Sequence, residues 1–128
     1  MDSKKTILYA SCLMLKIAKA DYKVTSEELI IIKEILEDYF NISNEDASEI
    51  IRNSYKELKD SIDIFKYANF LNHELSYQDK VDLIRCIFEV GYSDGELHYL
   101  ELHYIKTMSR LLNVEKDDLV KAKLEKKN

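Results

Sequence analysis

The chain has no proline, no tryptophan and only two glycines among its 128 residues. Gly and Pro supply most of the tight turns that join short strands, so a sheet built from hairpins is disfavoured. Leu, Ile, Lys and Glu, which are common in helical proteins, dominate the composition instead. The sequence therefore predicts an all-α fold, a compact bundle of six to seven helices.

Long apolar runs and an excess of basic residues are also absent. No stretch approaches the roughly 18 apolar residues that a membrane span requires. Lys and Arg number 19 against 24 Asp and Glu, which gives a net charge of −5. Affinity for phosphate backbones depends on clustered cations. We therefore expect no direct membrane insertion and no nucleic-acid partner.

Cysteine occurs only at Cys12 and Cys86, within apolar helical runs where a free cysteine usually packs as a small hydrophobe. The apolar stretch from Thr6 to Leu15, followed by Ala18-Lys-Ala20, imitates a secretory signal peptide. Cleavage after Ala20 would remove the counterpart of residues 81–93 in the repeat described next. We therefore expect a cytoplasmic protein.

The chain contains an internal repeat. Asp21-Tyr-Lys-Val-Thr-Ser-Glu-Glu28 follows an apolar helical run, and Asp94-Gly-Glu-Leu-His-Tyr-Leu-Glu101 follows another at a constant offset along the chain. Past a single deleted position, Phe40-Asn41-Ile42 pairs with Leu112-Asn113-Val114. The repeat covers approximately residues 5–47 and 78–119. It predicts two pseudo-symmetric halves within a single domain, residues 1–128.

Apolar residues at helical spacing and capping residues between them locate the expected helices. A Thr at position 25 with a Glu at position 28, for example, has the spacing of a capping box. Helices are expected at about residues 3–20, 25–40, 43–58, 61–72, 76–90, 99–112 and 116–126.

Each half places an Asp at the end of one helix and a Glu seven residues later, in the first turn of the next. We call residues 21–28 and 94–101 the first and second acidic corners. A tight connection brings such carboxylates within several ångströms of each other. If the corners face each other across the pseudo-twofold axis, Asp21, Glu28, Asp94 and Glu101 form a metal site. A cluster of carboxylate oxygens favours Ca²⁺ or Mg²⁺ over Zn²⁺.

Local roles compete with this interpretation. The capping box explains Glu28, and an Asp in a turn often bonds to its own backbone. In the second corner, however, the counterpart of Thr25 is His98, a poor N-cap. On this argument, capping does not explain Glu101 well, which favours a functional role.

The two corners also differ in sequence. Gly95 adopts a left-handed turn freely, whereas Tyr22 stands in its place in the first corner, so we expect a weaker or distorted first half-site. An EF-hand beginning at Asp94 is excluded because His98, Leu100 and Ile105 occupy ligand positions. A Zn²⁺ site with His98 is less favoured because His98 has no symmetric partner.

No recognised arrangement of nucleophile and base, and no phosphate-binding loop, is present in the sequence. We therefore expect that the protein is not an enzyme. Three tyrosines, Tyr92, Tyr99 and Tyr104, gather around the second corner and could rim a surface for another protein. The alternative function is a protein-interaction or dimerisation module, such as a homodimer, in which the acidic corners are only structural.

The segments Ala18-Lys-Ala-Asp-Tyr-Lys-Val-Thr-Ser-Glu-Glu28 and Val90-Gly-Tyr-Ser-Asp-Gly-Glu-Leu97, with Glu101 following, resemble the paired signatures of TerB-like domains. This family of tellurite-resistance proteins is similar to the N-terminal domain of membrane-anchored DnaJ-type co-chaperones. The resemblance covers nearly the whole chain and implies an all-helical fold with two pseudo-symmetric halves. It also implies metal ligation by the four acidic residues named above, and a bacterial stress-response or tellurite-resistance assembly with protein partners. Tyr22 departs from the family's usual glycine.

Overall fold

The structure is a computed structural model that describes residues 3–20, 24–60 and 63–127. These ranges contain seven α-helices and no strand. The all-α prediction is confirmed. The helices are α1 (Lys4–Ala18), α2 (Ser26–Tyr39), α3 (Asn44–Asp60), α4 (Ile64–Glu74), α5 (Tyr77–Gly91), α6 (Tyr99–Leu111) and α7 (Lys116–Lys127).

Side-chain caps explain where several helices begin. Ser3 accepts a hydrogen bond from the Thr6 backbone N–H, and Ser76 accepts one from the Asp79 backbone N–H. Such caps satisfy donors that the first helical turn leaves without partners. The expected bounds of the third and fourth helices were wrong by a few residues. α3 continues to Asp60, and α4 begins only at Ile64 because Asp63 is its N-cap.

The two halves repeat in backbone conformation as well as in sequence. α1 and α5 begin at Lys4 and Tyr77, and α2 and α6 begin at Ser26 and Tyr99, so both pairs of helices keep the same offset along the chain. The turns that follow α2 and α6 contain the two described non-glycine residues with positive φ. These are Asn41 at 55° and Asn113 at 59°. Asn tolerates this left-handed conformation, which commonly ends helices.

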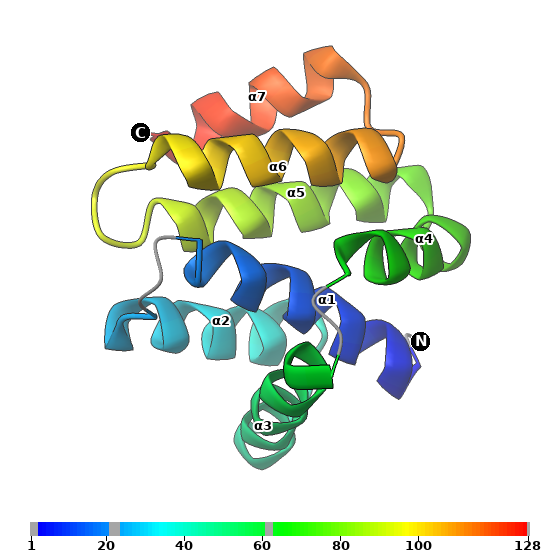
Figure 1. Cartoon of the computed structure of the whole chain (residues 1–128), viewed down its shortest axis with the longest axis vertical. Helices are drawn as coiled ribbons and strands as arrows, with labels where there is room; N and C mark the ends of the chain where they lie inside the picture. Colours follow the sequence, from blue (N-terminus) through cyan, green and yellow to red (C-terminus); the bar gives the residue numbers. More distant parts are fainter. Residues whose placement is uncertain (1–2, 21–23, 61–62, 128) are drawn as a thin grey trace.

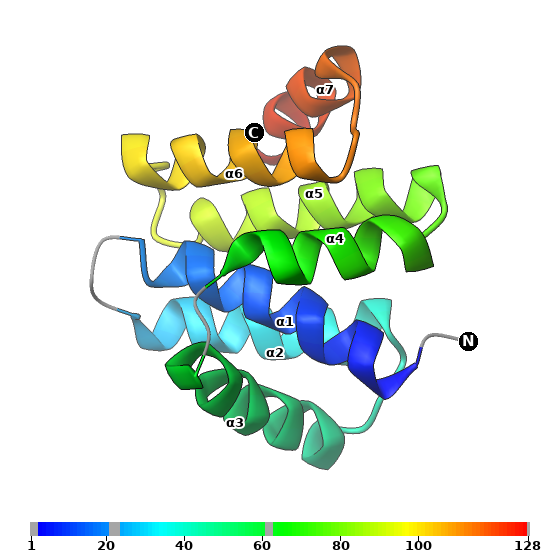
Figure 2. The ribbon, with the colours of Figure 1, turned by 45° about the vertical axis from the view of Figure 1, so that its right-hand side comes forward.

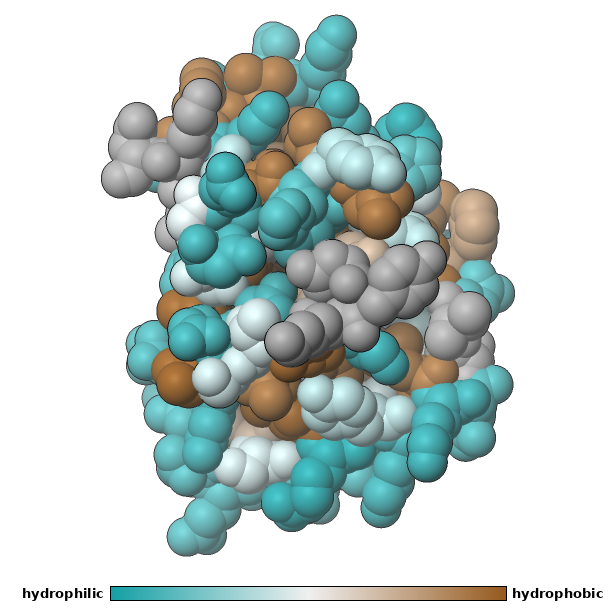
Figure 3. Space-filling view, turned by 60° about the vertical axis from the view of Figure 1, so that its left-hand side comes forward, coloured by the Kyte–Doolittle hydropathy of each residue, from teal (hydrophilic) through white to brown (hydrophobic). Residues whose placement is uncertain are grey.

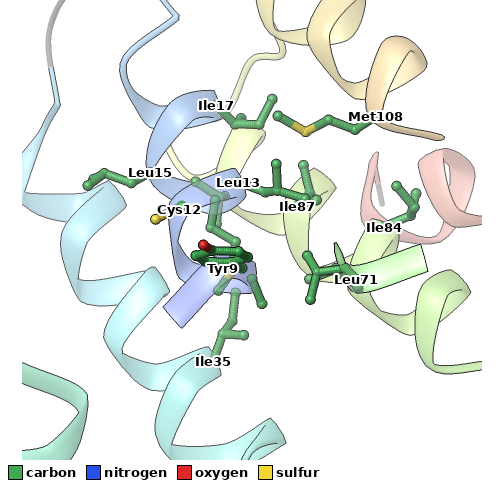
Figure 4. Close-up of a cluster of buried hydrophobic side chains, with 14 of the residues drawn as sticks. Tyr9, Cys12, Leu13, Leu15, Ile17, Ile35, Leu71, Ile84, Ile87 and Met108 are labelled. Atoms are coloured by element: carbon green, nitrogen blue, oxygen red, sulfur yellow. The ribbon is translucent and has the colours of Figure 1, made fainter. Parts of the chain in front are cut away.

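α1 is the centre of the molecule. It packs against α2, α3, α4, α5 and α6 (Figure 1). Its side chains are buried on nearly every side of the helix, and Figure 4 draws part of the resulting core, including Tyr9 and Leu13 of α1 with Leu71 and Ile87. The Tyr9 ring meets the fully buried Tyr67 ring edge to face, with centroids 5.0 Å apart. This core holds α1 and α5 together, and with them the connections that contain the acidic corners.

Candidate metal site at the acidic corners

The first acidic corner follows α1. Lys19 ends that helix with φ −91° and ψ 2°, and Ala20 is buried. Asp21 and Tyr22, on which the prediction for this corner rests, lie outside the described residues. The predicted role of Asp21 therefore stays a prediction.

Glu28 closes the first corner from the start of α2. Its Oε1 accepts a hydrogen bond from the Thr25 backbone N–H at 2.8 Å, and Thr25 Oγ1 accepts one from the Glu28 backbone N–H at 3.1 Å. The predicted capping box is confirmed. Glu28 is only 3% exposed, and its negative charge adds to the burial that raises the pKa of Tyr55. Glu28 thus places a buried carboxyl group at the N-terminus of α2, where the helix dipole favours negative charge.

The second corner begins in the same way as the first. Tyr92 ends α5 with φ −91° and ψ 3°, which are nearly the angles of Lys19. Gly95 follows with φ +95°, so the expected left-handed turn is confirmed. Asp94 Oδ1 accepts a hydrogen bond from the Glu96 backbone N–H at 3.2 Å. The Asp94 side chain nevertheless stays 40% exposed and can be reached from solvent.

The structure corrects our argument about Glu101. Its Oε1 accepts a hydrogen bond from the His98 backbone N–H at 2.9 Å, as Glu28 does from Thr25. This half of a capping box needs only a backbone N–H at the N-cap, which any residue except proline provides. Our inference from the poor capping side chain of His98 was therefore wrong. Glu101 is 1% exposed and has a structural role at the start of α6.

The end of α1, the start of α2 and the connection between α5 and α6 lie on the same side of the molecule in both ribbon views (Figures 1 and 2). Figure 3 turns this side toward the viewer and shows hydrophobic residues exposed among hydrophilic ones. A hollow of about 620 Å³ opens beside the second corner. Its lining includes Glu96, His98, Tyr99 and, from α7, Lys123. Sequence analysis missed Lys123, because nothing local relates the C-terminal helix to this corner.

The tyrosines around the second corner differ in exposure. Tyr99 is 81% exposed, while Tyr92 is half-buried and stacks against Phe88 with ring centroids 6.4 Å apart. Lys16 Nζ lies 5.0 Å from the centre of the half-buried Tyr104 ring. Of these three tyrosines, Tyr99 alone extends freely from the surface.

The described residues supply only some of the ligands that a cation site needs. Asp94 Oδ2 and His98 Nε2 lie 3.6 Å apart. Glu101 follows His98 by three residues, and it is buried. Within the described ranges, no three His, Cys, Asp or Glu side chains are grouped so that they could hold a metal ion. The predicted cluster also includes Asp21, outside those ranges, and so the four-carboxylate site stays a prediction. The donors themselves are hard oxygens, as Ca²⁺ and Mg²⁺ prefer.

The family model for the tellurite resistance protein TerB matches residues 8–124 of the chain. The chain belongs to the TerB family. The match includes both acidic corners and all seven helices in whole or in part. The resemblance expected from the paired sequence signatures is thus confirmed.

The overall fold is shared with a solved structure as well. A protein of unknown function from Porphyromonas gingivalis W83 superimposes with a TM-score of 0.73 at 18% sequence identity. The match covers 100% of this chain and 92% of that one. At this identity the likeness shows the fold alone. No curated protein matches the chain. None of the described helices is both long and apolar enough to cross a membrane.

Proposed function

We propose that this chain is a non-enzymatic, cytoplasmic TerB-like domain that binds a divalent cation at the acidic corners. Asp21, Glu28, Asp94 and Glu101 would supply the oxygen ligands, and Ca²⁺ or Mg²⁺ would be preferred to Zn²⁺. Through protein partners, the domain would contribute to a bacterial stress-response or tellurite-resistance assembly.

The position of the two corners is the observation that supports this proposal most. The start of α2, which carries Glu28, and the second acidic corner lie on the same side of the molecule (Figure 1), and the second corner combines an exposed Asp94 with a buried Glu101. The capping bond of Glu101 goes to Oε1, and an ionised carboxylate has about four lone-pair sites in all. Ca²⁺ collects about six to eight oxygen ligands in a flexible geometry, including backbone carbonyls and water.

A second candidate function is a protein-interaction or dimerisation module whose corners are purely structural. The capping bonds of Glu28 and Glu101 favour it, because they account for both glutamates without an ion. The exposed ring of Tyr99 beside the second corner offers a contact for a partner or for a homodimer.

Isothermal titration of the chelator-stripped protein with Ca²⁺, Mg²⁺ and Zn²⁺ tests the first candidate. Because the glutamates cap helices, the informative variant changes the aspartates, Asp21→Asn with Asp94→Asn. Asp38→Asn with Asp117→Asn is the matched control, since it removes the same charge from two exposed helical positions.

We expect saturable Ca²⁺ or Mg²⁺ binding in the wild type and in the control. Binding should weaken at least about tenfold in the corner variant, because that variant removes the charge of two proposed ligands. An equal loss in both variants would point to diffuse attraction by net charge rather than a site. No binding by the wild type would reject the proposal, and self-association that persists in chelator would then favour the second candidate.

A further inference from the structure

The two halves of the molecule differ at their third helix. α3 packs against both α1 and α2, whereas its counterpart α7 packs against α5 and makes little contact with α6 among the described residues. Figure 2 shows α7 turned away from α6. The seam between α6 and α7 is therefore more open than the equivalent seam between α2 and α3.

Two hollows follow each other along this seam. The first, of about 620 Å³, reaches Leu102 of α6 and Lys123 of α7. The second, of about 410 Å³, reaches Lys106 of α6 and Leu119 of α7, each one helical turn farther along. The hollow in the equivalent α2–α3 seam has about 300 Å³. We call the two hollows together the α6–α7 groove.

The groove is cationic although the protein is acidic. Lys106, Arg110, Lys116 and Lys123 line it, and Glu96 is the one carboxylate among its described lining residues. None of the ion pairs among the described residues involves these four cations. In a chain of net charge −5, this surface concentrates positive charge that a negatively charged occupant would neutralise.

The groove also offers apolar surface. Leu102, Val114 and Leu119 contribute to its lining between the cations, and α6, which forms one wall, is 13 residues long. A groove between two helices with apolar side chains inside and charged ones at the rim fits an amphipathic helix. A nucleic acid would gain from the charges but leave the apolar lining without a partner.

We propose that the α6–α7 groove binds an acidic amphipathic segment of a partner protein. A second copy of this chain is a poorer fit. Its own acid-rich helices, α2 and α3, lie on the opposite side of the molecule from α7 (Figure 1), so copies joined groove to helix would not close into a dimer. Two grooves placed face to face would oppose like charges. The inference holds whether or not the corners bind an ion.

The test uses a fluorescein-labelled peptide of about 14 residues, rich in Glu, with Leu at i, i+3, i+4 and i+7. Fluorescence anisotropy is measured with the full chain in chelator, so that failure of the ion site does not affect the result. The groove variant is Lys106→Glu with Arg110→Glu. The matched control is Lys33→Glu with Arg52→Glu, which makes the same charge change at the α2–α3 hollow.

We expect the wild type and the control to bind the peptide and the groove variant to bind it at least about tenfold more weakly. Amide shifts in the NMR spectrum of the wild type should then map to α6 and α7. The proposal is overturned by lack of peptide binding, by equal loss in both variants, or by equal binding of a peptide with Lys in place of Glu.

Two further outcomes would assign the groove to another occupant and so also reject the proposal. A single-stranded oligonucleotide that binds more tightly than the peptide would indicate a nucleic-acid ligand. Sedimentation that reveals oligomers of the wild type, but not of the groove variant, would indicate a second copy of the chain.

Discussion

Glu28 and Glu101 occupy matching positions in the two halves and form the same hydrogen bond, from a backbone N–H three residues earlier to Oε1. Both side chains are almost completely buried. Burying a carboxylate is costly unless hydrogen bonds and favourable charges compensate. Here the N-termini of α2 and α6 supply both the backbone hydrogen bond and the positive end of the helix dipole. Any ion bound at the corners must therefore share these carboxylates with the helix caps.

Glu101→Ala should lower the free energy of unfolding by about 1–2 kcal/mol, because the His98 backbone N–H loses its partner at a partly buried site. Glu28→Ala should cost a similar amount. Urea denaturation measures both. Glu96→Ala, in the same connection but exposed, is the control and should change stability by less than about 0.5 kcal/mol. Equal stability of the Glu101→Ala variant and the wild type would contradict a capping role.

At the scale of elements, polar contacts hold α7 in place. The Tyr77 hydroxyl donates to Asp118 and accepts a hydrogen bond from the Glu115 backbone N–H at 3.1 Å. Arg85 Nε donates to Glu125 at 2.7 Å. Val120 and Leu124 of α7 are exposed, while Ala122 is buried. These contacts attach both the start and the C-terminal part of α7 to α5, and thereby leave the α6–α7 groove open.

Tyr77→Phe should therefore loosen α7 more than the rest of the molecule. The loss of two hydrogen bonds should lower the local opening free energy of α7 by about 1 kcal/mol, since the contacts are exposed. Hydrogen exchange should become several-fold faster in α7 while α1 keeps its protection. Tyr99→Phe removes the same group from a ring that is 81% exposed and should leave the exchange unchanged. Uniform acceleration in all helices would contradict this local role.

At the scale of the whole molecule, the core around α1 includes a small polar contact. Ser54 Oγ donates to the Ile50 carbonyl at 2.8 Å and lies 2.7 Å from Ser11 Oγ, next to the fully buried Cys12. Cys12 and Cys86 form no disulfide within the described part of the chain, and both lie in helices as the sequence indicated. Burial raises the pKa of the Cys12 thiol to about 12, from an ordinary value of 9.0.

This pKa shift predicts a loss of stability at alkaline pH. Above pH 9 the unfolded chain releases the thiol proton that the folded protein retains, so the free energy of unfolding falls as the pH rises from about 9 to about 12. Urea denaturation between pH 8 and pH 11 should show a shallower decline for Cys12→Ala than for the wild type. Burial and neighbouring carboxylates also raise the pKa of Tyr39, and so Tyr39→Phe should flatten the decline further. Identical pH profiles of the Cys12→Ala variant and the wild type would contradict the prediction.

Much of the fold follows from local patterns. The Thr25–Glu28 capping box and the matched Asn41 and Asn113 turns depend on residues a few positions apart, and their spacing is visible in the sequence. Glu101 was misjudged because the side chain at the N-cap was taken as the test of capping. The bond that matters goes to the backbone, which the choice of His98 does not affect.

The sequence by itself determined the helices, their repeat in two halves and the family. Caps and apolar periodicity act within single helices, and the repeat is a direct similarity between two segments of the sequence. Only the tertiary structure decided that α7 lies against α5 and leaves α6 partly uncovered. That arrangement depends on contacts between residues far apart in the chain, such as Tyr77 with Asp118 and Arg85 with Glu125. The α6–α7 groove exists because these long-range contacts differ between the two halves.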